Sequence, residues 1–348
     1  MQPEILSRII TGLIGLARRK VEFIWHGGEP LLAGKGFFRD ALDIQRRLQR
    51  DELEILNSVQ TNATLIDQEW IDFFQSNHFR VGISLDGPSS VHDRQRVDVV
   101  GNPSFDQVFR AVELLKKNDV GFGVLAVVTK HSLPFVDEIY RFFVANDIKA
   151  IDFLPYVEFN RPTKSISESS LTPSEFAEFV IRIFDLWIED DDPSVRIRYL
   201  ENVLTGLLGK APLLCKFGAT CSDYISIDSN GDVYPCDCFI GEESLIFGSI
   251  MAEDLDTILN GATRAEYVAK VNAPKEECQN CEWLPICNGG CSRYRYFYAD
   301  SFAGTNYFCP ARKMIFAYIN RKVSSILASL GLQPGSSQML ARSLVPRM

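Results

Sequence analysis

The chain has 348 residues, a hydrophobic fraction of 46%, a charged fraction of 23% and a net charge of −9. These values are typical of a soluble globular protein with one large domain or two. The acidic balance argues against nucleic acid as a partner, because phosphate binding needs a basic surface and no basic patch is visible in the sequence.

The first apolar run, residues 9–17, is too short to span a bilayer. The basic residues Arg18, Arg19 and Lys20 follow this run, whereas in a signal peptide they would precede it. The run predicts an amphipathic helix. We therefore expect a cytoplasmic protein without a membrane partner, in a reducing compartment that suits thiolate sites.

Residues 21–156 alternate between β-rich runs and helical patterns, which predicts repeated βα units and a parallel sheet. Strands are expected at residues 21–26, 54–60, 80–85, 121–129 and 150–155. Helices are expected at residues 37–49, 67–76, 105–117 and 134–145. Five strands are too few to close an eight-stranded barrel, so the pattern favours a partial barrel or an open sheet.

A longer helix is predicted at residues 173–187, and the acidic run 189–192 with Pro193 marks a domain boundary after it. We expect one domain over residues 1–195 and a second, cysteine-bearing domain over residues 196–320. A last helix is expected near residues 312–330. Residues 321–348 are expected to hold the end of this helix and a tail that frays.

All nine cysteines lie between Cys215 and Cys309, and eight of them form two spaced sets. The sets are Cys215, Cys221 and Cys236 (C-x5-C-x14-C), and Cys278, Cys281, Cys287, Cys291 and Cys309 (C-x2-C-x5-C-x3-C-x17-C). Three plus five ligands make two fourfold sites for zinc or iron–sulfur clusters, and spacing alone leaves both metals open. Gly289 and Gly290 permit the tight turn within the second set. Cys238 is left over, and disulfides are less favoured because no secretory signal is visible.

Polar residues follow the ends of three predicted strands. The first strand ends at His26 and is followed by Gly27-Gly28-Glu29-Pro30, where two glycines allow close approach of a ligand and the glutamate can accept hydrogen bonds from an ammonium group. Asn62 follows the second strand and Ser84 lies in the third. The carboxyl ends of parallel strands meet at one edge, so these groups should converge on one site.

Beyond the third strand lie residues with a structural alternative. Asp86 is interpreted mainly as a cap of the turn before Gly87-Pro88. His92 and Asp93 could equally begin the following helix.

Seven motifs together resemble one family. They are WHGGEPLLAG at 25–34, SVQTNATL at 58–65, VGISLDGP at 81–88, HDRQR at 92–96, VYPCD at 233–237, CNGGCSRYR at 287–295 and NYFC at 306–309. Over about residues 20–320 the chain is similar to radical S-adenosylmethionine (SAM) enzymes with a SPASM domain, and most to the anaerobic sulfatase-maturating enzymes. This resemblance implies an α/β fold: a partial (β/α)6 TIM-like barrel lacking its first strand, followed by a cysteine-rich SPASM domain.

The resemblance also assigns the candidate site residues. It implies one auxiliary [4Fe–4S] cluster on Cys215, Cys221, Cys236 and Cys291, and another on Cys278, Cys281, Cys287 and Cys309. It implies that Gly27, Gly28 and Glu29 meet the amino group of SAM, and that Asn62, Ser84 and Arg96 lie at other cofactor or substrate contacts. Asp237 matches the family's proposed general base, with a turn residue or a hydrogen-bond partner of the cluster ligand as its structural alternative.

The sequence departs from the family pattern in two places. No cysteine precedes Cys215, so the CxxxCxxC motif that holds the third, catalytic [4Fe–4S] cluster is absent, together with the first barrel strand. We expect a start assigned too late or a fragment, and a chain that as given does not cleave SAM. The second departure is His26, which stands where sulfatase-maturating enzymes usually carry glutamine; we assign it no chemical role.

The predicted function of the full-length protein is radical modification of a peptide or protein side chain, with a flavodoxin or ferredoxin as electron donor. For a sulfatase, the product would be formylglycine from a cysteine or serine. Two alternatives stay open. One is maturation of a ribosomally made precursor peptide; the other is a non-catalytic iron–sulfur fragment that binds peptides.

Overall fold

The structure, a computed structural model, describes residues 1–160, 163, 165–218 and 220–329. The chain divides into two compact units, each assembled from separate stretches. Unit 1 contains Met1–Ser84, Asp106–Phe122 and Cys221–Asn272; unit 2 contains Leu85–Phe105, Gly123–Thr220 and the stretch from Ala273 on. Both units therefore combine residues of the predicted barrel with residues of the predicted cysteine-bearing domain. The domain boundaries expected from the sequence, 1–195, 196–320 and 321–348, stay predictions.

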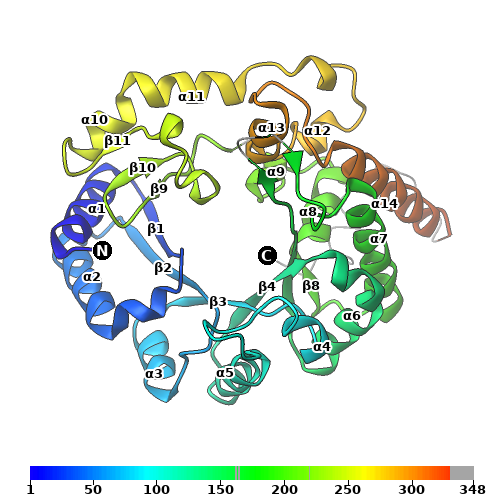
Figure 1. Ribbon diagram of the computed structural model, residues 1–348, viewed down its shortest axis with the longest axis horizontal. Helices are drawn as coiled ribbons and strands as arrows, with labels where there is room; N and C mark the ends of the chain where they lie inside the picture. Colours follow the sequence, from blue (N-terminus) through cyan, green and yellow to red (C-terminus); the bar gives the residue numbers. More distant parts are fainter. Residues whose placement is uncertain (161–162, 164, 219, 330–348) are drawn as a thin grey trace. The chain divides into compact units, whose positions relative to one another are not determined.

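Unit 1 contains three parallel strands in the order β1-β2-β3 (Figure 1). The strands are β1 (Lys20–Trp25), β2 (Glu54–Thr61) and β3 (Arg80–Ser84), in a register that pairs Lys20 with Glu54 and Ser58 with Arg80. The helices are α1 (Pro3–Leu16), η1 (Pro30–Ala33), α2 (Gly34–Leu48), α3 (Gln68–Ser76) and α5 (Phe105–Lys117). Strand and helix positions agree with the sequence prediction to within a few residues, and α1 contains most of the apolar run 9–17 and extends back to Pro3.

Aromatic side chains fill the space between α2, α3 and the strands of unit 1. Phe38, Trp70, Phe73, Phe74 and Phe79 are buried and form edge-to-face, tilted or stacked contacts with one another. Burying each such side chain stabilises the fold by about 1.5–3 kcal/mol. The beginning of α3 is fixed locally, because the Asp67 carboxylate accepts a hydrogen bond from the Trp70 amide at 2.8 Å.

The third stretch of unit 1 folds back on the first. It contains the antiparallel strands β9 (Ser226–Ile227), β10 (Asp232–Tyr234) and β11 (Gly248–Ser249), the turns η3 (Asp237–Phe239) and η4 (Glu243–Leu245), and the helices α10 (Leu255–Asn260) and α11 (Ala262–Asn272). Arg8 of α1 donates to the Ile250 carbonyl at 3.1 Å. A side chain at Gly12 of α1 would lie 2.9 Å from Leu255 Cβ, so glycine permits this close packing.

Unit 2 contains three further parallel strands in the order β4-β5-β8. These are β4 (Phe122–Val128), β5 (Ala150–Pro155) and β8 (Arg196–Ile197), and β6 (Phe159–Asn160) pairs with β7 (Ser165–Ile166). The helices are α4 (Ser89–His92), η2 (Lys130–Phe135), α6 (Val136–Ala145), α7 (Pro173–Asp190), α8 (Arg198–Leu207), α9 (Cys215–Gly218), η5 (Glu276–Cys278), α12 (Leu284–Cys287), α13 (Ser292–Ala299) and α14 (Cys309–Ser329).

Two helices of unit 2 begin where their sequences dictate. Thr172 and Glu175 form a reciprocal capping box at the start of α7, with Pro173 at its first position. Helix α14 packs against α7, and Tyr318 donates to the Asp185 carboxylate at 2.7 Å. Helix α14 begins at Cys309, three residues earlier than predicted; the predicted tail falls on residues 330–348, which lie outside the described residues.

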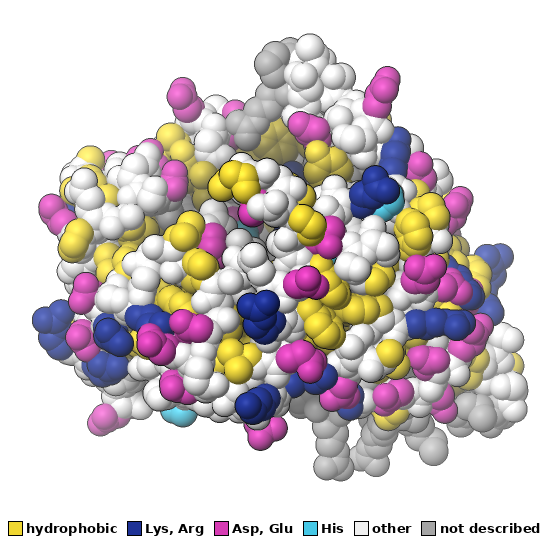
Figure 2. All heavy atoms as spheres, turned by 60° about the horizontal axis from the view of Figure 1, so that its bottom comes forward, with side chains coloured by type: hydrophobic (Ala, Val, Ile, Leu, Met, Phe, Trp, Pro, Cys, Tyr) yellow, Lys and Arg dark blue, Asp and Glu magenta, His cyan; other side chains and the backbone are white. Residues whose placement is uncertain are grey.

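None of the described helices is long and apolar enough to cross a membrane. On the face shown in Figure 2, lysine and arginine side chains are interspersed with aspartate and glutamate. Opposite charges are therefore mixed over this face and do not gather by sign.

Candidate functional site

The turn after β1 is joined to the end of β2 by one carboxylate. Gly27 and Gly28 have φ angles of 97° and 56°, which favour glycine, and no atom lies within 4 Å of an added Cβ at either position. Glu29 accepts hydrogen bonds from the amides of Leu31 at 3.0 Å and Asn62 at 2.7 Å, and from the Thr61 hydroxyl at 2.7 Å. A carboxylate has about four acceptor positions, so Glu29 keeps capacity for an ammonium donor.

Asn62 and Ser84 lie near this turn within unit 1. Asn62 Oδ1 accepts from the Thr64 amide at 3.0 Å and the Thr64 hydroxyl at 2.8 Å, so the amide NH2 group of Asn62 is the part that can donate to a ligand. The Ser84 hydroxyl accepts from Gln60 Nε2 at 3.3 Å. Gly27, Gly28, Glu29 and Asn62 are therefore brought together, and Ser84 is linked to them through β2.

Arg96 lies in unit 2, where it forms an ion pair with Asp86. Arg96 Nε and Nη2 donate to the Asp86 carboxylate at 2.6 and 3.1 Å. The same carboxylate accepts from Gln95 Nε2 at 2.7 Å and the Val127 amide at 2.8 Å, and its side chain is fully buried. Asp86 thus anchors two segments, a larger structural role than the turn cap that the sequence suggested.

His92 and Asp93 are engaged in local structure. His92 ends α4 and is buried; its Nδ1 accepts from the Asp86 amide, and its Nε2 faces Ser104 Oγ at 3.1 Å. Burial lowers the pKa of His92, with the charge of Asp86 acting in the opposite sense. The Asp93 carboxylate accepts from the amides of Ser104 and Phe105, where α5 begins, which agrees with its predicted role at the start of a helix.

Asp237 lies in unit 1 beside His26. His26 Nδ1 is 3.7 Å from Asp237 Oδ2, and both side chains are about half exposed, at 46% and 55%. His26 directly precedes Gly27, so the candidate base lies next to the candidate SAM-binding turn. Cys238 is also close: one ligand atom each of Cys236, Asp237 and Cys238 lies within 4.8 Å of the others. Sequence reasoning did not connect His26 with Asp237, because the two residues are far apart in the chain.

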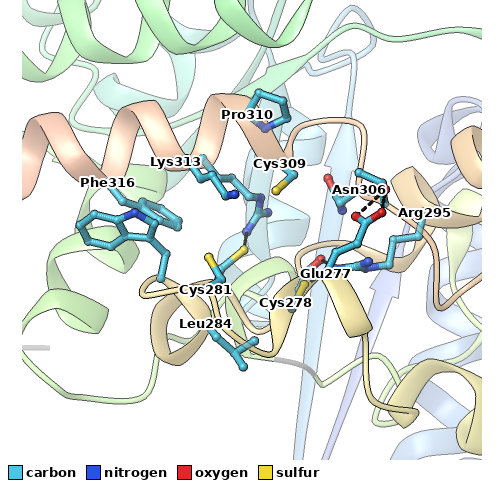
Figure 3. Close-up of a pocket in the computed structure, with 15 residues that line it drawn as sticks. Glu277, Cys278, Cys281, Leu284, Arg295, Asn306, Cys309, Pro310, Lys313 and Phe316 are labelled. Carbon is cyan, nitrogen blue, oxygen red and sulfur yellow. Dashed lines mark hydrogen bonds between the residues drawn. The ribbon is translucent and has the colours of Figure 1, made fainter.

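Four of the predicted cluster ligands line one cavity of about 380 Å³ in unit 2. Figure 3 shows Cys278, Cys281 and Cys309 directed toward the same space, between the η5 loop and the start of α14; Cys287 also lines the cavity. None of the nine cysteines, all of which lie among the described residues, forms a disulfide. The observed grouping fits the predicted ligand set.

The donor set of this cavity suits a metal centre. Four thiols line the one cavity, and four thiolates are the ligand set of [4Fe–4S] clusters and of tetrahedral zinc sites alike. The residues present therefore fit an iron–sulfur cluster.

Two arginines that sequence reasoning missed border the cavity. Arg295 Nη2 donates to Cys278 Sγ at 3.4 Å, and Arg312 Nη1 donates to Cys287 Sγ at 3.5 Å. Burial is the largest single influence on the pKa of Arg312 and lowers it, but the charge and hydrogen bond of Cys287, together with the charges of Tyr199 and Cys291, raise the pKa overall. The signals were present in the sequence: Arg295 lies four residues after Cys291, and Arg312 lies one helical turn after Cys309.

The other four predicted ligands are divided between the units. Cys221 and Cys236 lie in unit 1, whereas Cys215 and Cys291 lie in unit 2. Their assignment to one cluster stays a prediction.

Comparisons with known proteins agree with this arrangement. Residues 2–142 match the radical SAM superfamily, and residues 215–282 match the SPASM iron-sulfur cluster-binding domain. These matches define a radical SAM enzyme with a TIM-like α/β fold and a SPASM domain.

The chain is 36% identical over 321 residues to the cysteine-type anaerobic sulfatase-maturating enzyme of Clostridium perfringens strain 13, covering 91% of this chain and 86% of that protein. It is 31% identical over 336 residues to the serine-type enzyme of Bacteroides thetaiotaomicron, covering 92% and 81%. The structure of native anSMEcpe with bound AdoMet and Cp18Cys peptide matches with a TM-score of 0.86 and 34% identity, covering 95% of this chain and 92% of that one. The chain belongs to the family of anaerobic sulfatase-maturating enzymes.

Proposed function

We propose that this protein, joined to the CxxxCxxC motif that the printed sequence lacks, converts a cysteine or serine of a sulfatase into formylglycine, with Asp237 as the base. The observation that carries the proposal is the 3.7 Å approach of His26 Nδ1 to Asp237 Oδ2. Asp237 directly follows the predicted ligand Cys236, and His26 directly precedes Gly27 of the turn proposed to hold SAM. A proton acceptor therefore lies beside the turn proposed to hold SAM.

The chain's own residues would divide the work as follows. Glu29 and the amide group of Asn62 would bind the polar groups of SAM, while Gly27 and Gly28 let the backbone approach it. Arg96 Nε and Nη2 are held by Asp86, so Arg96 would meet a ligand through Nη1. Ser84 is proposed as a further contact.

SAM held by these residues would supply hydrogen-atom abstraction, and clusters held by the cysteines would supply one-electron transfer. Asp237 would then accept the proton that leaves the substrate radical. The carboxylate is about half exposed, so a bound peptide could reach it from solvent.

We further propose two auxiliary clusters, one on Cys278, Cys281, Cys287 and Cys309 and one on Cys215, Cys221, Cys236 and Cys291. A four-thiol cavity supports the first assignment, and the family resemblance supports the second. A flavodoxin or ferredoxin is the proposed electron donor.

The test uses a fusion that places the family's CxxxCxxC segment ahead of Met1, incubated with SAM, reductant and a sulfatase peptide carrying cysteine or serine. We expect 5′-deoxyadenosine and a formylglycine product by mass spectrometry. Asp237→Asn should keep 5′-deoxyadenosine formation and lower product formation by roughly 10²–10⁴-fold, because the proton acceptor is lost. The unfused chain should form neither product.

Asp223→Asn is the matched control, since it removes a carboxylate two residues after the predicted ligand Cys221. It should leave both products unchanged. Full formylglycine yield from Asp237→Asn would remove Asp237 from the mechanism. Modification of a ribosomal precursor peptide and not of the sulfatase peptide would replace the proposed substrate.

A further inference from the structure

Two buried arginines flank the cavity that holds Cys278, Cys281, Cys287 and Cys309. Arg295 is 3% exposed and Arg312 is 4% exposed, and no other arginine in the described part of the chain is buried. Each donates a hydrogen bond to a different ligand thiol. Both buried guanidinium groups of the described fold are therefore gathered at this one site.

Within residues 1–329, apart from the few positions left undescribed, no ion pair joins Arg295 or Arg312 to an acidic side chain, although Glu277 lines the same cavity. Arg295 donates instead to the carbonyls of Gly289 and Gly304, and the Arg312 guanidinium lies 4.8 Å from the centre of the Phe217 ring. A buried charge is costly unless an opposite charge is close, and the ligand sulfurs of Cys278 and Cys287 are groups able to carry negative charge to which these two cations donate.

The glycines between Cys287 and Cys291 make room for both guanidinium groups. A Cβ at Gly289 would lie 2.6 Å from Arg295 Nη2, and a Cβ at Gly290 would lie 3.3 Å from Arg312 Cζ. The φ angles of 80° and 78° independently favour glycine at both positions. The turn is thus shaped around the arginines as well as around the cysteines.

We infer that Arg295 and Arg312 are positioning and charge-compensating residues that raise the reduction potential of the cluster at Cys278, Cys281, Cys287 and Cys309. This inference rests on the proposed function, since it requires an iron–sulfur cluster at that site. Taking up one electron, from the substrate radical in the proposed reaction or from dithionite in vitro, adds one negative charge to a site that is already negative. Nearby positive charge and hydrogen bonds to the ligand sulfurs stabilise this reduced state more than the oxidised state.

The test is an anaerobic potentiometric titration of the reconstituted chain, read by visible absorbance and electron paramagnetic resonance, with iron counted on the same sample. The reduction step that disappears in the Cys278→Ala variant belongs to the cluster at Cys278, Cys281, Cys287 and Cys309. At a fixed ambient potential, Arg312→Gln and Arg295→Gln should each lower the ratio of reduced to oxidised cluster at least about tenfold, or about 59 mV for one electron. Arg312→Lys keeps the charge and should stay within about twofold of the parent chain.

Arg321→Gln is the matched control, because it removes an exposed arginine from the same helix and should leave the step unmoved. A glutamine variant that retains its iron and shows an unchanged potential would overturn the inference. If one glutamine variant loses its iron, the reduction potential of the other variant is the test. If both variants lose their iron, the arginines hold the cluster in place without setting its reduction potential, and the inference is wrong. A colourless chain without iron would refute it together with the cluster assignment, whereas failure to modify the sulfatase peptide would leave the measured shift standing.

Discussion

Replacing Asp86 with alanine should destabilise the part of unit 2 that joins residues 85–105 to β4. The fully buried Asp86 carboxylate accepts four hydrogen bonds, two from Arg96, one from Gln95 and one from the Val127 amide. Alanine removes all four and leaves the Val127 amide without its acceptor. The perturbation therefore acts on two segments that are distant in sequence.

The expected cost follows from these contacts. Breaking a buried ion pair by removing one partner typically costs about 3–5 kcal/mol. The Arg96 side chain is 25% exposed and can turn toward water, so we expect about 3 kcal/mol for Asp86→Ala. Asp86→Asn keeps an oxygen for the Val127 amide but loses the charge, and should cost about 1.5–2 kcal/mol, since hydrogen bonds to charged groups contribute about 1.5–3 kcal/mol.

Hydrogen exchange at the Val127 amide and its neighbours measures this effect locally, which avoids assuming that two units and bound clusters unfold in one step. Asp98→Ala is the control, because the exposed Asp98 caps its own loop and its loss should cost about 1 kcal/mol or less. If Asp86→Ala accelerates exchange no more than Asp98→Ala does, the buried ion pair does not hold this region. Arg96→Ala should match Asp86→Ala in stability if Arg96 is structural, and should weaken SAM binding in addition if it is also a ligand.

Three further predictions concern other parts of the chain. Cys238→Ala should retain about eight irons after anaerobic reconstitution, because eight other cysteines complete two clusters; a loss of about four would show that Cys238, which lies close to Cys236, is a ligand. The lowered pKa of His92 means that the native state binds fewer protons than the unfolded state, so stability should be full above about pH 6.5 and fall below it by up to about 1.4 kcal/mol per pH unit until the folded pKa is passed. His92→Gln should flatten this dependence in melting temperature, and an unchanged slope would contradict the assignment. Gly206→Ala should lower the free energy of unfolding by about 1–2 kcal/mol, measured by thermal unfolding, because the new Cβ would lie 2.6 Å from Ile286 Cγ2. A more stable variant would show that α12 moves to accommodate the methyl group without cost.

The sequence predicted the elements with strong periodicity. The helix at residues 105–117 and the strand at residues 150–155 match α5 and β5, and the helices expected to begin at residues 67 and 173 begin at Gln68 and Pro173. The sixth parallel strand, β8, was missed because two residues carry no period; its pairing with β5 comes from tertiary packing. The helix predicted at residues 134–145 begins as η2, because Pro134 lies within that turn and interrupts the α-helical pattern.

The site was predicted where residue type and spacing carry the chemistry. Cysteine spacing indicated two fourfold sites, and the family resemblance supplied the choice of metal and the division of ligands. Long-range contacts could not be read this way. His26 and Asp237 meet only in the folded unit, and the burial of Arg295 and Arg312 depends on how α13 and α14 pack around the cavity. The sequence alone does not distinguish a buried arginine from a solvated one, because burial depends on neighbours that only the fold brings together.

The three-stretch construction of unit 1 has a consequence for biosynthesis. Helix α1 packs against α10, but roughly 170 residues separate the end of β3 from Leu255. At about 5–20 residues per second, a ribosome needs about 10–30 s to make that interval. During this time the surface of α1 that α10 later covers is open to solvent. The nascent chain should therefore be a chaperone client until residues 221–272 have emerged.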